Sequence, residues 1–133
     1  NGFGEIDFEL YEADVFQQLR RFRGGRKTFD LIVLDPPKFA PIARYKEKAA
    51  RAYKDINLLA FKLVNPGGIL FTFSCSGGVD RDFFQKVVAD AAVDAGVNAR
   101  IIAEMAQSPD HPVALNFPES RYLKGMVVRR GRD

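Results

Sequence analysis

The stretch from residue 29 to residue 39, FDLIVLDPPKF, constrains the fold more than any other part of the sequence. Residues 31–34 are an unbroken aliphatic run between polar residues and proline, a pattern that predicts a strand buried on both faces. Pro36 and Pro37 have no backbone N–H groups, so a central strand cannot continue through them. Asp35 is therefore expected on a stiff loop at the carboxyl end of the strand, where open parallel sheets bind ligands. It is either a site residue or only a cap of the next helix.

The rest of the sequence alternates between strand and helix patterns. Residues 6–10 alternate apolar and acidic side chains, which predicts a strand. Asp14 is suited to cap a helix that Gly24 and Gly25 end. Further helices are predicted over residues 44–64 and 80–95, and further strands over residues 69–73, 99–103 and 121–129, with a turn at residues 65–68. This order predicts an α/β fold with a three-layer parallel sheet, whose final strand could be antiparallel.

Size and composition limit the class of protein. A chain of 133 residues suits one domain, and its 47% of hydrophobic and 28% of charged residues are typical of a globular protein. No apolar run approaches the roughly 20 residues that span a bilayer, and no signal peptide is expected. The single cysteine, Cys75, excludes an internal disulfide, and with one histidine a catalytic zinc is not expected. A cytoplasmic protein fits this composition best.

Two groups of basic residues are candidates for contact with nucleic acid. The first, at the end of the helix after Asp14, is either a solvated helix end or a phosphate-contacting patch. The second lies near the start of the helix over residues 44–64, where the helix dipole disfavours cations, so local helix stability does not explain it. The first group is Arg20, Arg21, Arg23, Arg26 and Lys27, and the second is Lys46, Lys48, Arg51 and Lys54.

Cys75 follows the strand predicted over residues 69–73 and lies between Ser74 and Ser76. Consecutive strands in such folds often pair, so we expect Cys75 and Asp35 at the same edge of the sheet, where they could share a substrate. A thiol among small residues is accessible, and a following helix that points its amide end at the thiol favours the thiolate. The alternative is an inert buried cysteine.

Five segments of the sequence resemble the catalytic half of the bacterial ribosomal RNA large-subunit cytosine-5 methyltransferases. They are residues 35–39 (DPPKF), 53–57 (YKDIN), 74–76 (SCS), 110–113 (DHPV) and 122–125 (YLKG), which extend over nearly the whole chain. A lone DPP would not be specific, because N-methyltransferases have a similar motif. The resemblance implies a Rossmann-like fold, S-adenosylmethionine as the cofactor and ribosomal RNA as the partner.

The resemblance also implies roles for three acidic or nucleophilic residues. Cys75 matches the nucleophile, whose thiolate adds to C6 of cytosine so that C5 can attack a methyl group. Asp35 matches the acid that contacts N3 and the amino group of the flipped base, beside the cofactor. Asp14 matches the acidic position near the cofactor adenine, unless it is a plain helix cap.

Other residues of the two loops are expected to contact the substrate. The resemblance implies that Pro36 and Pro37 shape the base pocket and that Ser74 lies beside the nucleophile. Phe39 could pack on the base or on its own loop, and Lys38 could contact an RNA phosphate.

The sequence departs from this family in two ways. Many RNA cytosine-5 methyltransferases have a second cysteine beside the proline of the Asp35 loop, which helps to release the product, and this loop has none. His111 is a candidate for that base, or else an ordinary loop histidine. The chain also begins at Asn1 and lacks the glycine-rich loop and the ribose-binding acid. We therefore expect the C-terminal part of a catalytic domain, inactive in isolation.

Two other functions are compatible with the residues. One is an RNA N-methyltransferase, in which Asp35 holds an exocyclic amine and Cys75 is structural. The other is a non-catalytic RNA-binding module whose cations contact the phosphates. The missing first strand of the methyltransferase sheet would leave residues 31–34 as an open edge. Either residues 6–10 cover that edge or a second copy of the chain does, and the latter predicts a homodimer.

Overall fold

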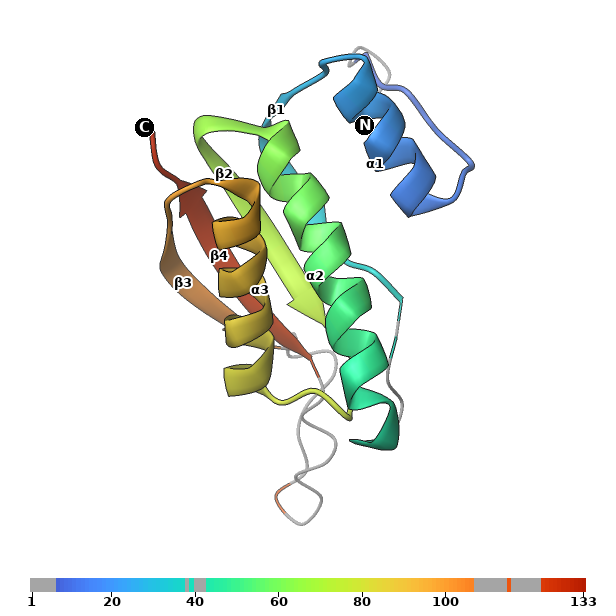
Figure 1. The fold of residues 1–133 in the computed structure, drawn as a ribbon, viewed down its shortest axis with the longest axis vertical. Coiled ribbons are helices and arrows are strands. Elements are labelled where there is room, and N and C mark those ends of the chain that lie inside the picture. Colours follow the sequence, from blue (N-terminus) through green and yellow to red (C-terminus); the bar gives the residue numbers. More distant parts are fainter. Residues whose placement is uncertain (1–6, 38, 40–42, 107–114, 116–122) are drawn as a thin grey trace.

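The computed structural model describes residues 7–37, 39, 43–106, 115 and 123–133 (Figure 1). Its helices are α1 (Val15–Gly24), α2 (Lys46–Leu63) and α3 (Arg81–Ala95), and a short 3-10 turn, η2 (Ala43–Tyr45), precedes α2. Its strands are β1 (Phe29–Leu34), β2 (Val64–Ser74), β3 (Ala99–Ala106) and β4 (Lys124–Arg130). The predicted α/β class is confirmed, and β3 extends beyond the predicted end at residue 103.

The described strands form one mixed sheet in the order β1–β2–β4–β3 (Figure 1). β1 and β2 are parallel neighbours, whereas β4 runs antiparallel to both β2 and β3. The last strand is thus antiparallel, as the sequence suggested. Because β1 and β2 run in the same direction, their carboxyl ends lie at the same edge of the sheet.

Helices α2 and α3 lie side by side over one face of the sheet, and α1 packs beside α2 (Figure 1). The core between the helices and the sheet contains the buried rings of Tyr53, Phe61 and Phe84, with Leu70 and Met126 from the strands. Removal of this apolar surface from water is the main stabilising term of such a core. The described part of the chain therefore contains two of the three expected layers.

Side-chain caps begin both α1, for which the sequence predicted Asp14 as the cap, and α3, for which it predicted only a helix start near residue 80. The carboxylate of Asp14 accepts a hydrogen bond from the backbone N–H of Gln17 at 3.0 Å, and that of Asp80 accepts one from Phe83 at 2.8 Å. Each bond satisfies a first-turn donor that has no partner within the helix. α3 ends at Gly96, whose φ of 73° is a left-handed conformation that glycine adopts without strain.

Strand β1 differs from the predicted strand buried on both faces. Its Leu31 and Val33 side chains are 53% and 61% exposed, whereas Leu34 belongs to the core. A continuous aliphatic run suits a strand with both faces covered, but the described helices cover only one face of the sheet. Among the described strands β1 also forms the edge of the sheet, as the missing first strand implied.

The prediction of a strand over residues 6–10 is wrong for residues 7–10, which the structure describes. Residues 7–10 form no strand, and Phe8 and Leu10 are 78% and 88% exposed. Ile6 lies outside the described residues. A period-two pattern stabilises a strand only when a neighbouring strand pairs with it, and this segment joins no described strand. Residues 7–10 therefore do not cover the edge of β1.

The turn predicted at residues 65–68 lies inside β2 rather than before it. The pairing of β1 with β2 changes register between Phe29 and Leu31, opposite these residues. A Cβ on Gly68 would lie 2.8 Å from the carbonyl oxygen of Asp30, so only glycine fits at this close approach. The turn-forming residues thus produce an irregularity within the strand.

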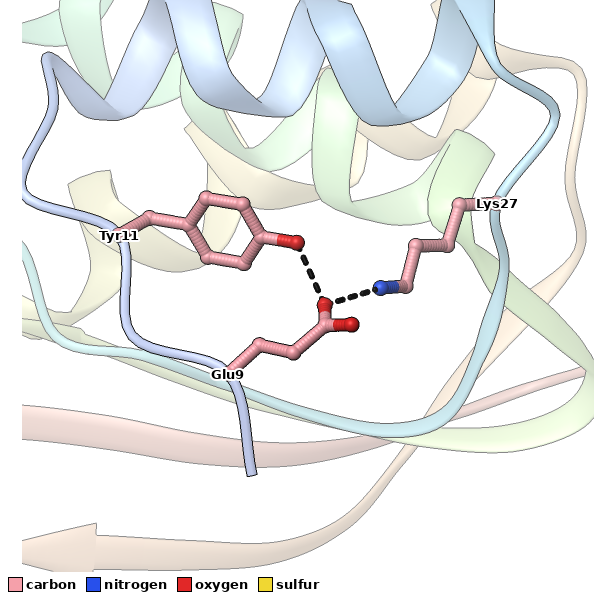
Figure 2. A network of polar contacts seen from close by, with 3 residues as sticks. All are labelled: Glu9, Tyr11 and Lys27. Carbon is pink, nitrogen blue, oxygen red and sulfur yellow. Dashed lines mark hydrogen bonds and ion pairs between the residues drawn. The ribbon is translucent and has the colours of Figure 1, made fainter. Parts of the chain in front are cut away.

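An exposed polar network joins the segment before α1 to the residues before β1 (Figure 2). One carboxylate oxygen of Glu9 accepts hydrogen bonds from the hydroxyl of Tyr11 and, at 3.0 Å, from Nζ of Lys27. The hydrogen bond from Tyr11, followed by the hydrogen bond and charge of Lys27, holds the pKa of Glu9 below its ordinary value. All three side chains are exposed, so the network contributes little to stability.

Candidate active site

Asp35 and Cys75 lie at the same edge of the sheet, as the sequence predicted. Asp35 directly follows β1, and Cys75 directly follows β2, its parallel neighbour. Leu34 pairs with Thr72, so the two strands end at nearly the same level. Ligands of open α/β sheets bind at this edge, beyond the carboxyl ends of the strands.

Burial alternates in the same way along the two strand ends. Cys75 is partly exposed between the buried Ser74 and Ser76, and Asp35 is exposed between the buried Leu34 and Pro36. Successive side chains of an extended chain point to opposite faces, and the buried members face α2 and α3. The thiol and the carboxylate are therefore both expected toward the face that the described helices leave uncovered.

The loop that contains Cys75 is held through Ser76, which is fully buried. Oγ of Ser76 accepts a hydrogen bond from the backbone N–H of Phe39 at 3.0 Å and shares another with the hydroxyl of Tyr53 on α2. Phe39 is the last residue of the DPPKF segment that begins with Asp35. One hydroxyl therefore connects the loop after β1, the loop after β2 and helix α2.

Lys124 of β4 holds the same loop through backbone carbonyls. Its side chain is 7% exposed, and its Nζ donates to the carbonyl oxygens of Ser76 at 2.7 Å and Val79 at 2.6 Å. A buried ammonium is costly unless hydrogen bonds replace its water. The conformation that presents both carbonyls is therefore coupled to the burial of Lys124.

A second buried network connects β2 with α2. Oγ1 of Thr72 donates to Oδ1 of Asn57 at 2.6 Å, and Nδ2 of Asn57 donates to the backbone carbonyl of Tyr53 at 2.8 Å. Asn57 and Thr72 are both fully buried. These hydrogen bonds satisfy polar groups that would otherwise destabilise the core, and they connect α2 to β2.

Asp14, the predicted cofactor contact, lies at the start of α1. The ring of Phe39 is 6.3 Å from that of Phe16 and 4.8 Å from that of Tyr53, between ring centres. Because Phe16 belongs to the first turn of α1, its contact with Phe39 brings this end of the helix toward the Asp35 loop. Asp14 is exposed and caps α1.

Two predicted substrate contacts, Lys38 and His111, lie outside the residues that the structure describes. The other predicted members of the site are described: Pro36 is buried, Pro37 is exposed, and Phe39 is half-buried. The structure therefore brings the Asp35 loop and the Cys75 loop together at one edge of the sheet.

Two of the four cations in the basic group at the start of α2 make contacts with neighbouring side chains of the protein. Nζ of Lys54 lies 2.8 Å from the carboxylate of Asp94, and Nζ of Lys46 lies 4.1 Å from the centre of the Phe83 ring. These are an ion pair and a cation–π contact at the protein surface. The other two cations of the group are exposed.

Sequence patterns do not reveal the network around Ser76. They place Tyr53 on the inward face of a helix and Ser76 beside the thiol, but not in contact. Lys124 does carry a signal, because a lysine within an apolar strand is almost never buried without partners. The identity of those partners depends on loop conformations that no local pattern contains.

Within the described residues, no helix is long and apolar enough to cross a membrane. The same residues contain no group of three or more His, Cys, Asp or Glu side chains that could hold a metal ion.

The fold is that of Rossmann-like methyltransferases. SMU.776, provisionally described as a methyltransferase and complexed with SAH, superimposes with a TM-score of 0.72 at 21% identity, over 88% of this chain and 30% of that chain. The M1.HpyAVI–SAM complex gives a TM-score of 0.59 at 18% identity, over 92% of this chain and 52% of that chain. Likeness at such identities establishes the fold and not the substrate.

Proteins with similar sequences are named for a substrate, which SMU.776 and M1.HpyAVI are not. The ribosomal RNA large subunit methyltransferase I of Shewanella frigidimarina is 58% identical over 129 residues, which are 97% of this chain and 32% of the relative. The protein of the same name from Tolumonas auensis is 59% identical over 118 residues, 89% of this chain and 30% of the relative. The chain thus spans about a third of the length of these curated relatives. No protein-family model matches it.

Proposed function

We propose that the protein containing this chain is an S-adenosylmethionine-dependent methyltransferase that makes 5-methylcytosine in ribosomal RNA. The chain would be the C-terminal part of its catalytic domain. The observation that carries the proposal is the position of Cys75 and Asp35 at the ends of adjacent parallel strands, where a nucleophile and a base-binding acid could share one cytosine. The name of the similar proteins supports the same substrate class. Action on bacterial ribosomal RNA would place the protein in the cytoplasm.

Cys75 would provide the nucleophile for covalent activation of cytosine. C5 of cytosine is a poor nucleophile, and addition of the thiolate to C6 moves the electron pair of the C5–C6 double bond onto C5. C5 would then take the methyl group from the cofactor sulfonium, whose sulfur would leave as the neutral thioether. Removal of the C5 proton by a base would then allow elimination of the Cys75 thiolate, which restores the double bond. The partly exposed position of Cys75 between buried neighbours suits a nucleophile that is both accessible and fixed.

Asp35 would hold the edge of the flipped base. Its exposed carboxylate can accept a hydrogen bond from the amino group and stabilise a proton at N3, which draws electrons from C6 during the addition. Pro36 and Pro37 restrict the backbone beside it. Phe39 would lie beside the base, whereas Ser74, whose buried hydroxyl accepts a hydrogen bond from the backbone N–H of Ser76, would hold the backbone next to the thiol.

Asp14 and Asp35 fit two parts of an S-adenosylmethionine site, because both carboxylates are exposed and the Phe16–Phe39 contact brings their segments together. The cofactor would supply the methyl group. No G-x-G segment follows a strand in the described residues, so the ribose and methionine ends of the cofactor have no evident partner here. We therefore expect weak binding by the isolated chain, and micromolar affinity in titration calorimetry would contradict this.

RNA containing 5-fluorocytosine tests the covalent step. Fluorine at C5 cannot leave as a proton does, so the enzyme remains attached to the RNA. The full-length protein should give an adduct that survives denaturing electrophoresis, and Cys75→Ala should abolish it. Gln85→Ala, an exposed substitution on α3, serves as the matched control and should form the adduct normally.

The alternatives predict different outcomes in the same assay. An adduct that persists in Cys75→Ala would contradict the role of Cys75. Methyl transfer to an exocyclic amine without an adduct would favour an RNA N-methyltransferase. Salt-dependent RNA binding that is insensitive to changes at Cys75 and Asp35, without methyl transfer, would favour a binding module.

A further inference from the structure

We infer that Ser76 is a positioning residue, which fixes Cys75 and Asp35 relative to each other by joining their loops through one buried hydroxyl. This inference rests on the proposed function, because it assigns Ser76 a role in the geometry of that site. Ser76 adjoins the thiol in sequence, but its own side chain faces the core and not the substrate.

The first step of the argument is the contact between the two loops. The backbone N–H of Phe39 donates to Oγ of Ser76 at 3.0 Å. Phe39 and Asp35 belong to one short segment that contains Pro36 and Pro37, and proline fixes φ near −65°. A segment stiffened in this way transmits the position of one end to the other. Fixing the amide of Phe39 therefore restricts where the carboxylate of Asp35 can lie.

The second step is the attachment of Ser76 to the core. Its hydroxyl shares a hydrogen bond with Tyr53, whose side chain is fully buried and packs against Phe39 and Phe84 at ring distances of 4.8 Å and 5.5 Å. Its carbonyl accepts from Lys124 at 2.7 Å. Ser76 is thus held at both its side chain and its backbone, by α2 on one side and β4 on the other.

The third step is the effect of this connection between the two loops on the reaction rate. Two groups that act on one ring must be held at a productive separation, and a misplacement of about 1 Å can cost on the order of 100-fold in rate. Loss of the hydroxyl would leave the Phe39 amide and the Tyr53 hydroxyl without this partner. Both loops would then gain freedom while the catalytic groups themselves stay present.

Thr72→Val provides a matched control. Thr72 lies on β2, and Ser76 lies on the loop that follows this strand. Both residues are fully buried, and Thr72 also makes a side-chain hydrogen bond to α2, at 2.6 Å. Its hydroxyl bonds to Asn57, which in turn reaches the backbone carbonyl of Tyr53 and not its hydroxyl, so the Thr72 hydroxyl makes no hydrogen bond to the Asp35 loop or the Cys75 loop. Valine keeps the backbone pairing of this position with Leu34. A purely structural effect of losing a buried hydrogen bond should therefore appear in both variants, whereas a positioning effect should appear only in Ser76→Ala.

The experiment compares Ser76→Ala, Tyr53→Phe and Thr72→Val in the full-length protein. We expect Ser76→Ala to slow adduct formation with 5-fluorocytosine RNA about 10–100-fold at saturating RNA, with the half-saturating RNA concentration changed less than about twofold. Tyr53→Phe keeps the ring and should slow the reaction less. Thr72→Val should lower the thermal midpoint as Ser76→Ala does and keep the parent adduct rate. Hydrogen exchange at the Phe39 amide should accelerate in Ser76→Ala alone.

The outcomes separate this inference from the proposed function. Parent-like adduct rates in Ser76→Ala, or an equal loss of rate in Thr72→Val, would overturn the positioning role. If Ser76→Ala does not fold, Tyr53→Phe decides by the same comparison. If the parent protein forms no adduct, the proposed function fails, and exchange at the Phe39 amide still decides whether the Ser76 hydroxyl holds the loop.

Discussion

Strands β1 and β2 are parallel neighbours that end in the two candidate site residues, but the protein supports them differently. β2 lies within the sheet, Leu70 on it is 1% exposed, and the loop after it is fixed by buried hydrogen bonds. β1 lies at the edge of the described sheet and Leu31 on it is 53% exposed, although Leu34 and Pro36, on either side of Asp35, are buried. The nucleophile's loop is therefore held by several buried hydrogen bonds, whereas the acid is held by its buried neighbours and by the hydrogen bond from the Phe39 amide to the nucleophile's loop.

The polar networks beside the two strands show the same contrast. Each contains a tyrosine hydroxyl, a lysine ammonium and an acceptor oxygen: Tyr53, Lys124 and Ser76 after β2, and Tyr11, Lys27 and Glu9 before β1. The first is buried and the second exposed. Hydrogen bonds are stronger where water is excluded, and their loss there is more costly. We therefore expect the buried network to contribute more to stability than the exposed one.

The largest difference between the two strand ends should appear when Cys75 and Asp35 are replaced and the reaction is measured. Cys75→Ser should abolish the adduct, because a hydroxyl is a far weaker nucleophile than a thiolate. Asp35→Asn should lower methyl transfer by about 100- to 10,000-fold, the range of acid–base effects, while a slow adduct still forms. The thermal midpoint should stay unchanged in Asp35→Asn because the carboxylate is exposed. Single-turnover assays with 5-fluorocytosine RNA measure adduct formation, and the same assays with unmodified RNA measure methyl transfer. Loss of the adduct to the same extent in Cys75→Ser and Asp35→Asn would contradict the assigned roles.

Two leucine-to-alanine substitutions, one on each face of the sheet, compare how much each face contributes to the free energy of unfolding. Leu70→Ala should lower the free energy of unfolding by about 2–5 kcal/mol because it leaves a cavity in the core. Leu31→Ala should change it by about 0.5 kcal/mol or less, as surface substitutions do. Urea unfolding of the isolated chain tests both. In the full-length protein, a cost at Leu31 that rises toward the cost at Leu70 would mean that further structure covers this face.

The edge of β1 should determine self-association of the chain. An open row of N–H and C=O groups beside the exposed Leu31 and Val33 favours pairing with a second copy. We expect a dimer by light scattering and dissociation by Val33→Lys, because charge on an edge strand disfavours pairing. Val93→Lys, on an exposed valine of α3, is the control and should leave the dimer intact. A monomer whose β1 amides exchange freely would contradict this prediction.

The sequence was sufficient to predict the elements whose signals are local. Asp14 caps the helix that it was expected to begin, the helix predicted over residues 80–95 lies at Arg81–Ala95, and the last strand is antiparallel. The common edge of Asp35 and Cys75 followed from strand order, because parallel neighbours end together.

Other features depend on contacts between distant residues and could not be predicted. The pattern of residues 7–10 resembles a strand, but a strand needs a partner, which is a property of the whole sheet. The aliphatic run of β1 predicts two covered faces, and only the arrangement of the helices shows one of them open. The link between Ser76, Phe39 and Lys124 joins three segments far apart in sequence.

The smallest expected effect concerns the exposed network of Glu9, Tyr11 and Lys27. The lowered pKa of Glu9 means that its contribution to stability is present above the ordinary value of 4.5 and is lost as the pH falls through the folded-state pKa. Tyr11→Phe and Lys27→Met should each return the pKa of Glu9 toward 4.5, because each removes a hydrogen bond to its carboxylate. Carbon-detected NMR titration of the carboxyl group measures both changes. Glu9→Gln should leave the acid-unfolding midpoint unchanged, since all three groups are exposed. A fall in the thermal midpoint of Glu9→Gln as large as that of Ser76→Ala would mean that burial does not distinguish the two networks.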